Sequence, residues 1–264
     1  MANKAFKLAI ITGGSYGIGK ACSTILAESG INIAILSRKR KEGIDTVDEL
    51  KKYNIKVIHI ETDVSNKEQV KKSVRSVFSE FGRIDILINN AGIVSPLKYF
   101  FEQSEEEWDQ VIKVHLYGTY YMMKEVAPIM IRQKYGRIVN ISSFVAQGGS
   151  CGRANYVSAK CGIEGLTMTA AKELGEYGIT VNVVRPGSTL TPMTKARGYD
   201  FNAIAKKVPC QKIGDPEDIA QLVNFLIKEE SNYITGQIIT VDGGLSIAGV
   251  GLINELAPIK KLSD

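Results

Sequence analysis

Short runs of apolar residues alternate with longer amphipathic segments along almost the whole chain. The runs are rich in Ile and Val and mostly lack the polar alternation of a half-exposed strand. Such continuous apolar strands are typical of a parallel sheet that is covered by helices on both faces. Seven strands are predicted in this way, over residues 7–12, 31–36, 56–61, 84–89, 137–142, 180–184 and 237–241.

The segments between these strands are long enough to form the helical crossovers that parallel pairing requires, as in residues 17–30, 67–81 and 155–177. No linker, low-complexity tract or internal repeat interrupts the alternation. The pattern therefore predicts a single α/β domain over residues 1–264, built on a Rossmann-type doubly wound, seven-stranded parallel sheet flanked by helices.

Residues 104–130 contain a helix start followed by an unusually apolar stretch. Ser104 with Glu107 three residues later forms a capping box, and the acidic first turn suits a helix dipole better than a metal site. Residues 111–130 are apolar nearly all round, so this helix is expected to be buried on both sides. Either a thick core or a subunit interface satisfies that condition. We favour the interface, in a homotetramer or homodimer.

Composition and charge exclude several classes of protein. The 264 residues are 44% hydrophobic and 23% charged, which excludes a disordered or fibrous chain. The net charge of +5 is too small to indicate nucleic-acid binding, and no apolar run is long enough for a membrane span. Four cysteines and two histidines lack the spacing of metal ligands, so no metal is expected. A cytoplasmic enzyme or binding protein with reduced thiols is the simplest interpretation.

A glycine-rich turn follows the first predicted strand, with glycines at positions 13, 17 and 19. Such glycines permit a tight turn and let the backbone approach a pyrophosphate, while the free amides of the next helix donate hydrogen bonds to it. Alone this signal is weak. Its position at the first strand of a βαβ series indicates a dinucleotide site.

The end of the second strand indicates which dinucleotide is preferred. NAD-binding folds often place a carboxylate there, to accept from the ribose 2′-hydroxyl. Here Ser37 is followed by Arg38, Lys39 and two further cations, without an acid. A guanidinium pairs with a 2′-phosphate, whereas a carboxylate repels it. The sequence thus favours NADP(H), with NAD(H) as the alternative, unless these cations are only a solvated helix face.

The pattern Tyr-x-x-x-Lys occurs three times, at Tyr16, Tyr120 and Tyr156. Only Tyr156, which is followed by Lys160, has a serine thirteen residues upstream, namely Ser143 at the end of an apolar strand. This spacing, with the glycine-rich turn and the Asn-Asn-Ala-Gly element at 89–92, singles out one constellation.

With these motifs the chain resembles the short-chain dehydrogenase/reductase family, in its 3-oxoacyl-reductase-like single-domain branch. The resemblance covers nearly the whole chain, from the turn at 12–19 to the segment 214–244. It implies hydride transfer between a nicotinamide and a ketone or secondary alcohol. Tyr156 would then exchange the proton, Ser143 would polarise the carbonyl, and Lys160 would hold the nicotinamide ribose.

The four-residue spacing places the phenol of Tyr156 and the ammonium of Lys160 on one helix face. A nearby cation favours the phenolate, and lowering the pKa of a tyrosine from about 10 to about 7 requires about 4 kcal/mol. We therefore expect Lys160, with the charge of an oxidised nicotinamide, to lower the pKa of Tyr156.

The resemblance also implies cofactor contacts at matching positions. Asp63 and Val64 are expected at the adenine, and Asn89 is expected to bridge strands. The full set of cofactor-binding positions comprises Gly13, Ser15, Tyr16, Gly17, Ile18, Gly19, Ser37, Arg38, Lys39, Asp63, Val64, Asn90, Ala91, Gly92, Tyr156, Lys160, Pro186, Gly187, Thr189 and Thr191.

The chain departs from the family pattern at His115, where an asparagine usually offers its backbone carbonyl to a water in the proton relay. If only the carbonyl matters, His115 substitutes without loss. Its imidazole can instead join the relay and titrate near neutrality, or be a satisfied structural group. His115 is therefore included among the candidate catalytic residues.

The substrate is less well defined. Lys134 fits one position of a basic patch that would dock an acyl carrier protein, but Tyr177 stands where an arginine is often found. We therefore favour a free small-molecule carbonyl or alcohol, with a 3-oxoacyl-carrier-protein reductase or an NAD-linked sugar or steroid dehydrogenase as alternatives. A non-catalytic nucleotide-sensing module is the alternative of another class. Residues 188–211 are expected to cover the substrate, and the C-terminal extension 247–264 is assigned no role.

Overall fold

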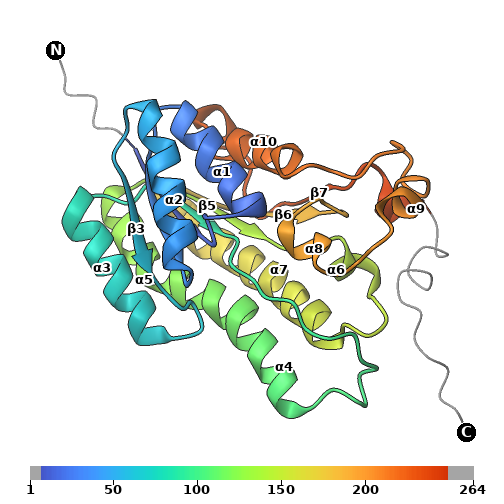
Figure 1. Cartoon of the computed structure of the whole chain (residues 1–264). Helices are drawn as coiled ribbons and strands as arrows, with labels where there is room; N and C mark the ends of the chain where they lie inside the picture. The colour runs from blue at the N-terminus through green and yellow to red at the C-terminus, as the bar shows by residue number, and fades with distance from the viewer. Residues whose placement is uncertain (1–6, 249–264) are drawn as a thin grey trace, which may run out of the picture.

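The computed structural model describes residues 7–248, which form a seven-stranded parallel sheet with helices on both faces (Figure 1). The strand order β3-β2-β1-β4-β5-β6-β7 is that of a doubly wound Rossmann-type sheet. The strands are β1 (Leu8–Thr12), β2 (Asn32–Ser37), β3 (Val57–Glu61), β4 (Ile86–Asn89), β5 (Gly136–Ile141), β6 (Ile179–Pro186) and β7 (Ile238–Val241).

All seven predicted strands are confirmed, with most ends shifted by one or two residues. β1, β4 and β5 are buried at every position, because helices cover both faces. Successive side chains of β1 enter opposite layers: Leu8 and Ile10 join one apolar core, Ala9 and Ile11 the other. This two-sided burial is why the strands read as continuous apolar runs.

Six long helices form the two outer layers (Figure 1). One layer packs on the core that contains Ile11 and consists of α1 (Gly17–Glu28), α2 (Arg40–Leu50) and α10 (Pro216–Leu226). The other packs on the core that contains Ile10 and consists of α3 (Lys67–Phe81), α5 (Gly118–Gln133) and α7 (Ala154–Leu174).

The expected helix start at Ser104 is confirmed, but the apolar helix beyond it is not continuous. Ser104 Oγ accepts from Glu107 N at 3.3 Å, and the Glu107 carboxylate accepts from Ser104 N at 3.0 Å, which opens α4 (Glu105–Ile112). A π-helical segment, Lys113–Tyr117, then separates α4 from α5. Tyr117 and Tyr120 are 45% and 41% exposed, so the described chain by itself does not bury this helix on both sides. The interface role remains a prediction.

Short elements complete the described chain, and two of them, α8 and α9, lie within the expected substrate loop. They are α6 (Val145–Gly148), α8 (Pro192–Lys195), α9 (Phe201–Ala205) and the 3-10 segments Lys51–Tyr53, Gly175–Tyr177, Glu229–Ser231 and Leu245–Ile247. Most of the C-terminal extension expected over 247–264 lies outside the described residues.

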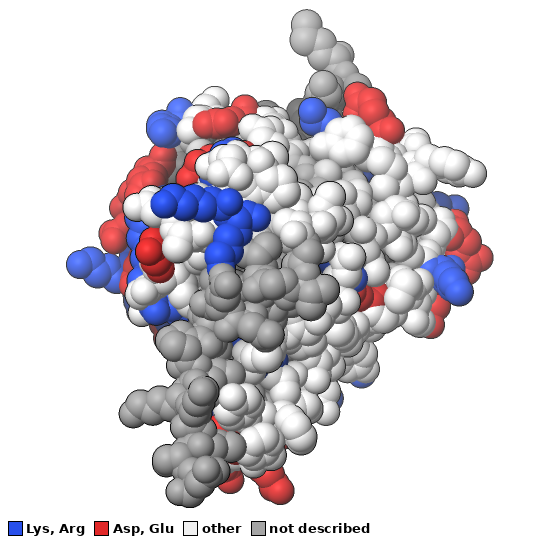
Figure 2. All heavy atoms as spheres, turned by 90° about the vertical axis from the view of Figure 1, so that its right-hand side faces the viewer, with Lys and Arg blue, Asp and Glu red and all other residues white. Residues whose placement is uncertain are grey.

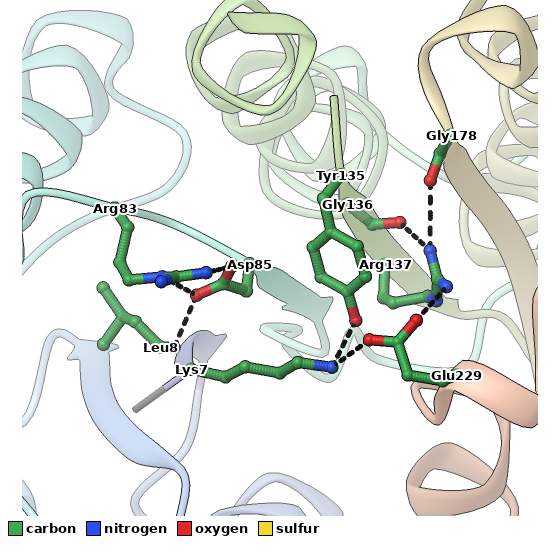
Figure 3. A network of polar contacts seen from close by, with 9 residues as sticks. All are labelled: Lys7, Leu8, Arg83, Asp85, Tyr135, Gly136, Arg137, Gly178 and Glu229. Carbon is green, nitrogen blue, oxygen red and sulfur yellow. Dashed lines mark hydrogen bonds and ion pairs between the residues drawn. The ribbon is translucent and has the colours of Figure 1, made fainter. Parts of the chain in front are cut away.

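A polar network joins the amino ends of the central strands (Figure 3). The fully buried Asp85 carboxylate accepts two hydrogen bonds from Arg83, at 2.7 and 2.8 Å, and one from Leu8 N at 2.8 Å. Beside it, Lys7 donates to the Tyr135 hydroxyl at 2.8 Å and to Glu229. These contacts stabilise the end of the sheet at which the strands begin, opposite their carboxyl ends.

Three further features of the described residues concern surface charge, membrane-spanning helices and metal sites. On the face that bears α9, uncharged side chains predominate over the described residues and charged ones lie mainly around the margin (Figure 2). Within residues 7–248, no helix has the length and apolar character to cross a membrane, and no three His, Cys, Asp or Glu side chains gather as metal ligands.

Candidate functional site

The candidate site is a cleft at the carboxyl ends of the strands, where β1 has β2 on one side and β4 on the other. The chain crosses over in opposite directions from this point, and open α/β sheets bind ligands at such a switch point. Tyr16 and Gly92 border both halves of the cleft, which makes it continuous from the β2 end to the start of α7.

The glycine-rich turn forms the floor of the cleft. Gly13 and Gly17 have positive φ angles of 64° and 55°, which side chains other than glycine rarely adopt. A Cβ atom on Gly19 would lie 2.2 Å from the carbonyl oxygen of Gly13, so this glycine serves the packing of α1 against the turn. Gly19 is the only predicted cofactor residue that does not line the cleft.

The start of α1 suits an anion. No side chain caps the helix, and its first turn contains no acid, so the donors at its positive end remain available to a pyrophosphate. Asn90 supports the turn from β4, donating from Nδ2 to the carbonyls of Thr12 and Gly13 at 3.1 and 3.2 Å. Glycine conformation, free donors and a close backbone thus fit the pyrophosphate of a dinucleotide.

The half of the cleft at the end of β2 is basic. Arg38 and Lys39 line it and are exposed, and the Lys39 ammonium lies 5.8 Å from the centroid of the Tyr16 ring. Lys39 also pairs with Glu42 at 3.2 Å on the surface of α2. No acid follows β2 directly. Ser37 stands at the end of the strand, where NAD-binding folds often have a carboxylate that accepts from the ribose hydroxyl.

Ser37 is held by two neighbours that the sequence did not connect. Its hydroxyl lies 3.0 Å from Nε2 of His59 on β3, and Ser15 Oγ donates to it at 3.3 Å. Burial lowers the pKa of the His59 imidazole, so this contact is made chiefly by neutral histidine at neutral pH. Six further predicted cofactor residues line this half: Gly13, Tyr16, Asp63, Val64, Ala91 and Gly92. Four residues that were not predicted also line it, namely Leu36, Thr62, Ile93 and Val114.

The other half of the cleft brings the candidate catalytic residues together. Ser143, Tyr156 and Lys160 line one end of it with His115. The predicted cofactor residues around them are Gly13, Tyr16, Gly17, Ile18, Asn90, Ala91, Gly92, Pro186, Gly187, Thr189 and Thr191.

Tyr156 and Lys160 share one face of α7, as their spacing predicts. The Lys160 Nζ atom lies 5.5 Å from the centroid of the Tyr156 ring and donates to the carbonyl of Ile141 at 2.6 Å. Both side chains reach the carboxyl end of β5, where Ser143 follows the strand.

In the protein alone the pKa of Tyr156 is raised, so its lowering with an oxidised nicotinamide bound stays a prediction. Burial raises the pKa of the phenol, while the hydrogen bond with Ser143 and the guanidinium charges of Arg153 and Arg197 lower it by less. Burial also lowers the pKa of the Lys160 ammonium to about 7, against the attraction of Glu164. Desolvation is therefore the largest cause of both shifts in this buried pair.

Buried polar contacts fix the elements that carry these residues. Asn89 Nδ2 donates to Asn140 Oδ1 at 2.8 Å, bridging β4 and β5 as expected. The carboxylate of Glu164 on α7 accepts from Ser142 at 2.8 Å and forms a two-fold ion pair with Arg185 of β6 at 2.6 Å. The ends of β5, β6 and α7 are thereby held in one arrangement around the site.

His115 lies in the π-helical segment and contacts the site, but it does not titrate near neutrality. Its Nε2 atom is 3.1 Å from the amide nitrogen and 3.0 Å from the carbonyl oxygen of Ile93, and its ring packs edge-on against Tyr156 with centroids 5.2 Å apart. Burial lowers its pKa to about 3, with a smaller contribution from the charge of Lys160. The hypothesis of a near-neutral imidazole in the relay is therefore wrong.

The expected substrate loop 188–211 contributes Met193 and Thr194 to the cleft. Both lie on α8, where Thr191 caps the helix and its Oγ1 accepts from Thr194 N at 3.2 Å. Thr194 and Arg153 were not singled out from the sequence. Arg153 immediately precedes α7, and its positive charge acts to lower the pKa of Tyr156. A cation three residues before the tyrosine was a readable signal for it.

The fold and the cleft define a dinucleotide-dependent oxidoreductase. Residues 13–246 match the family model described as Enoyl-(Acyl carrier protein) reductase. The chain is 40% identical over 241 residues to the 3-oxoacyl-(acyl-carrier-protein) reductase FabG of Staphylococcus epidermidis, covering 90% of this chain and 98% of the relative. It is 41% identical over 243 residues to the enzyme of that name from Thermotoga maritima, covering 91% and 98%. The crystal structure of levodione reductase superposes with a TM-score of 0.89 at 29% identity, covering 92% and 98%.

The chain belongs to the short-chain dehydrogenase/reductase family. The resemblance inferred from its motifs is confirmed, and so are the fold class and the enzyme class. The protein is an NAD(P)(H)-dependent oxidoreductase that acts on CH–OH or carbonyl groups.

Proposed function

We propose that the protein is an NADP(H)-dependent reductase of small-molecule ketones, or the corresponding alcohol dehydrogenase. The observation that carries this proposal is the arrangement of the cleft. Ser143, Tyr156 and Lys160 meet at one end of it, and Arg38 and Lys39 lie at the other, with the glycine-rich turn between them. One extended dinucleotide matches all three parts.

In reduction, Tyr156 donates its phenolic proton to the substrate oxygen, and Ser143 donates a hydrogen bond that polarises the same oxygen. The bound nicotinamide supplies or accepts the hydride. Lys160 lies at Tyr156, and its ammonium favours the phenolate that remains after proton transfer. Because burial raises the pKa of Tyr156 in the protein alone, the phenol is kept protonated and ready to donate in the reductive direction.

His115 is assigned a positioning role. Its ring packs against Tyr156 and its Nε2 atom joins the backbone of Ile93, so it links the π-helical segment to the wall of the cleft. Its backbone carbonyl accepts from Thr119 Oγ1 at 2.8 Å, and the family pattern assigns the relay water to this carbonyl.

NADP(H) is the preferred dinucleotide in this proposal. Arg38 and Lys39 supply positive charge at the end of β2, and Ser37 offers a hydroxyl there in place of a carboxylate. These groups suit a 2′-phosphate, because charge-assisted hydrogen bonds from a guanidinium are both strong and directional.

A 3-oxoacyl-(acyl-carrier-protein) reductase is the second candidate, and the similarity to enzymes of that name favours it. Lys134 at the end of α5 and the neighbouring Tyr177 supply only one of the two cations expected at a carrier-docking patch. A homotetramer or homodimer, with Tyr117 and Tyr120 at its interface, is also part of this proposal, as is a cytoplasmic location.

The test is to follow the oxidation of NADPH and NADH in parallel with aliphatic, aromatic, sugar, steroid and 3-oxoacyl carbonyls. We expect turnover of a free ketone with NADPH favoured at least tenfold in kcat/KM. Turnover of carrier-bound thioesters alone would replace our substrate assignment with the second candidate. A preference for NADH would show that Arg38 and Lys39 do not recognise a 2′-phosphate and are only surface cations.

A further inference from the structure

Among residues 7–248, two arginines that act electrostatically on the proposed proton donor have no carboxylate partner. Arg153 precedes α7, three residues before Tyr156, and Arg197 lies in the loop 188–211. Both donate to the hydroxyl of Tyr199, Arg197 at 3.1 Å, and Arg197 also donates to the carbonyl of Ser95 at 3.4 Å. Two segments far apart in sequence thus bring two guanidinium groups to one hydroxyl.

We propose that these guanidiniums bind a carboxylate of the substrate, so that the enzyme acts on an oxo acid or the corresponding hydroxy acid. This inference rests on the proposed function, because it names the substrate class of the same site. The hydroxyl of Tyr199 lies between the two cations and accepts a hydrogen bond from each.

The other partly buried arginines of the described chain show what is unusual here. Arg83, Arg137 and Arg185 each pair with a carboxylate, at 2.7, 3.4 and 2.6 Å respectively. Among residues 7–248, Arg153 and Arg197 have only neutral oxygen partners. A desolvated cation without an anion is costly, and a carboxylate that binds there removes that cost.

The electrostatics of Arg153 agree with this interpretation. Burial lowers the pKa of its guanidinium, the charge of Arg197 acts in the same direction, and Tyr199 and Tyr156 raise it. Because burial disfavours the charged form, an anion beside Arg153 would stabilise it. Two planar guanidiniums also match a carboxylate geometrically, since each can donate two parallel hydrogen bonds to it.

The position of the pair assigns it to the substrate and not to the dinucleotide. Neither guanidinium borders the cleft lined by the glycine-rich turn, whereas both act on the phenol of Tyr156 and lower its pKa. Their electrostatic effect on this phenol relates the pair to the proton donor and thus to the substrate. The phosphate of a carrier arm is separated from its thioester by a long chain, so a carboxylate of the substrate itself fits better.

The loop that carries Arg197 is anchored to the body of the protein. Tyr199 packs on the small apolar cluster of Ile204, Val208 and Leu245, and its ring lies edge-on to Phe201 with centroids 6.4 Å apart. Tyr199 therefore has a defined position, and the two guanidiniums that donate to it are oriented before substrate arrives.

The test compares a series of 2-, 3- and 4-oxo acids with their methyl esters, using NADPH and the full chain. We expect kcat/KM for at least one oxo acid to exceed that of its ester by 30-fold or more. Arg153→Met and Arg197→Met keep the apolar stem and remove the charge, and each should lower kcat/KM for the acid at least tenfold. Their effect on the ester should stay within threefold, so that most of the preference for the acid is lost.

Arg75→Met, which removes an exposed cation on α3, is the matched control and should change neither substrate. Equal effects on acid and ester, or no preference in the unaltered enzyme, would overturn the inference. So would turnover restricted to neutral ketones or to 3-oxoacyl coenzyme A thioesters.

Binding measurements separate this inference from the proposed function. The affinity for NADPH, measured by its fluorescence, should be unchanged in both arginine variants. If the unaltered protein did not bind NADPH, that result would count against the proposed function alone. Calorimetry of hydroxy acids on the NADP+-loaded protein reports the carboxylate site without turnover. Heat of binding that is lost in Arg153→Met and Arg197→Met supports the inference, and equal heat in all variants contradicts it.

Discussion

The Lys160 ammonium lies 5.5 Å from the centroid of the Tyr156 ring, on the same face of α7. The pair is buried, and burial moves the two pKa values apart, raising that of the phenol above its usual value and lowering that of the ammonium to about 7. In the protein alone, Tyr156 therefore stays protonated and can act as a proton donor. A positive charge on the oxidised nicotinamide would act in the opposite direction, toward the phenolate that oxidation of an alcohol requires.

Cofactor selection provides a prediction at the other end of the cleft. Arg38→Ala should weaken NADPH binding about tenfold, because it removes one charge-assisted contact with the 2′-phosphate. NADH binding should change by less than twofold. Fluorescence titration measures both, and Lys41→Ala is the control, since Lys41 is an exposed cation of α2 that does not line the cleft. Equal losses for both dinucleotides would show that Arg38 does not recognise the phosphate.

His115→Asn should keep kcat/KM within tenfold of the unaltered enzyme, because the backbone carbonyl is retained and the imidazole does not titrate near neutrality. A larger loss in steady-state assays would show that the ring itself matters to proton transfer.

The same residue predicts how stability depends on pH. The folded pKa of His115 is about 3, below the usual value of 6.5, so between these values the unfolded chain binds more protons. The stabilisation is complete above pH 6.5 and is lost as the pH falls toward 3, by at most about 1.4 kcal/mol per pH unit. Urea unfolding at pH 7.5 and 5 should therefore show a smaller acid destabilisation in His115→Asn. An unchanged difference would mean that other groups, such as His59, dominate.

The strand-end network predicts a stability change without a change in chemistry. Asp85→Ala leaves the buried amide of Leu8 without its acceptor and removes the partner of Arg83, whose side chain is 34% exposed, so unfolding should become easier by about 2 kcal/mol. Activity per folded molecule should be unchanged, because the network lies where the strands begin and the cleft lies at their carboxyl ends. Asp109→Ala, which breaks an exposed pair with Lys113, should cost less than about 0.5 kcal/mol. Similar costs for both variants would contradict this account.

The fold was predictable because the strands are buried on both faces and separated by helices of ordinary length. The cleft was predictable because its parts follow strand ends in the sequence, as Ser143 follows β5 and Arg38 follows β2. The π-helical turn at His115 was not, since apolar periodicity does not distinguish a π segment from an α-helix.

The direction of the pKa shift at Tyr156 was also beyond the sequence, because it depends on burial, which the four-residue spacing to Lys160 does not report. Arg153 and Arg197 are brought together by tertiary contacts with Tyr199, so their relation could be recognised only in three dimensions.

The central claim is that the phenol of Tyr156 supplies the proton in a reaction at the bound dinucleotide. The most direct measurement is single-turnover oxidation of bound NADPH by a reducible ketone, in the unaltered enzyme and in Tyr156→Phe. We expect the variant to bind NADPH within threefold of normal and to lose a thousandfold or more in rate. A variant that binds NADPH and still oxidises it within tenfold of the normal rate would contradict the account.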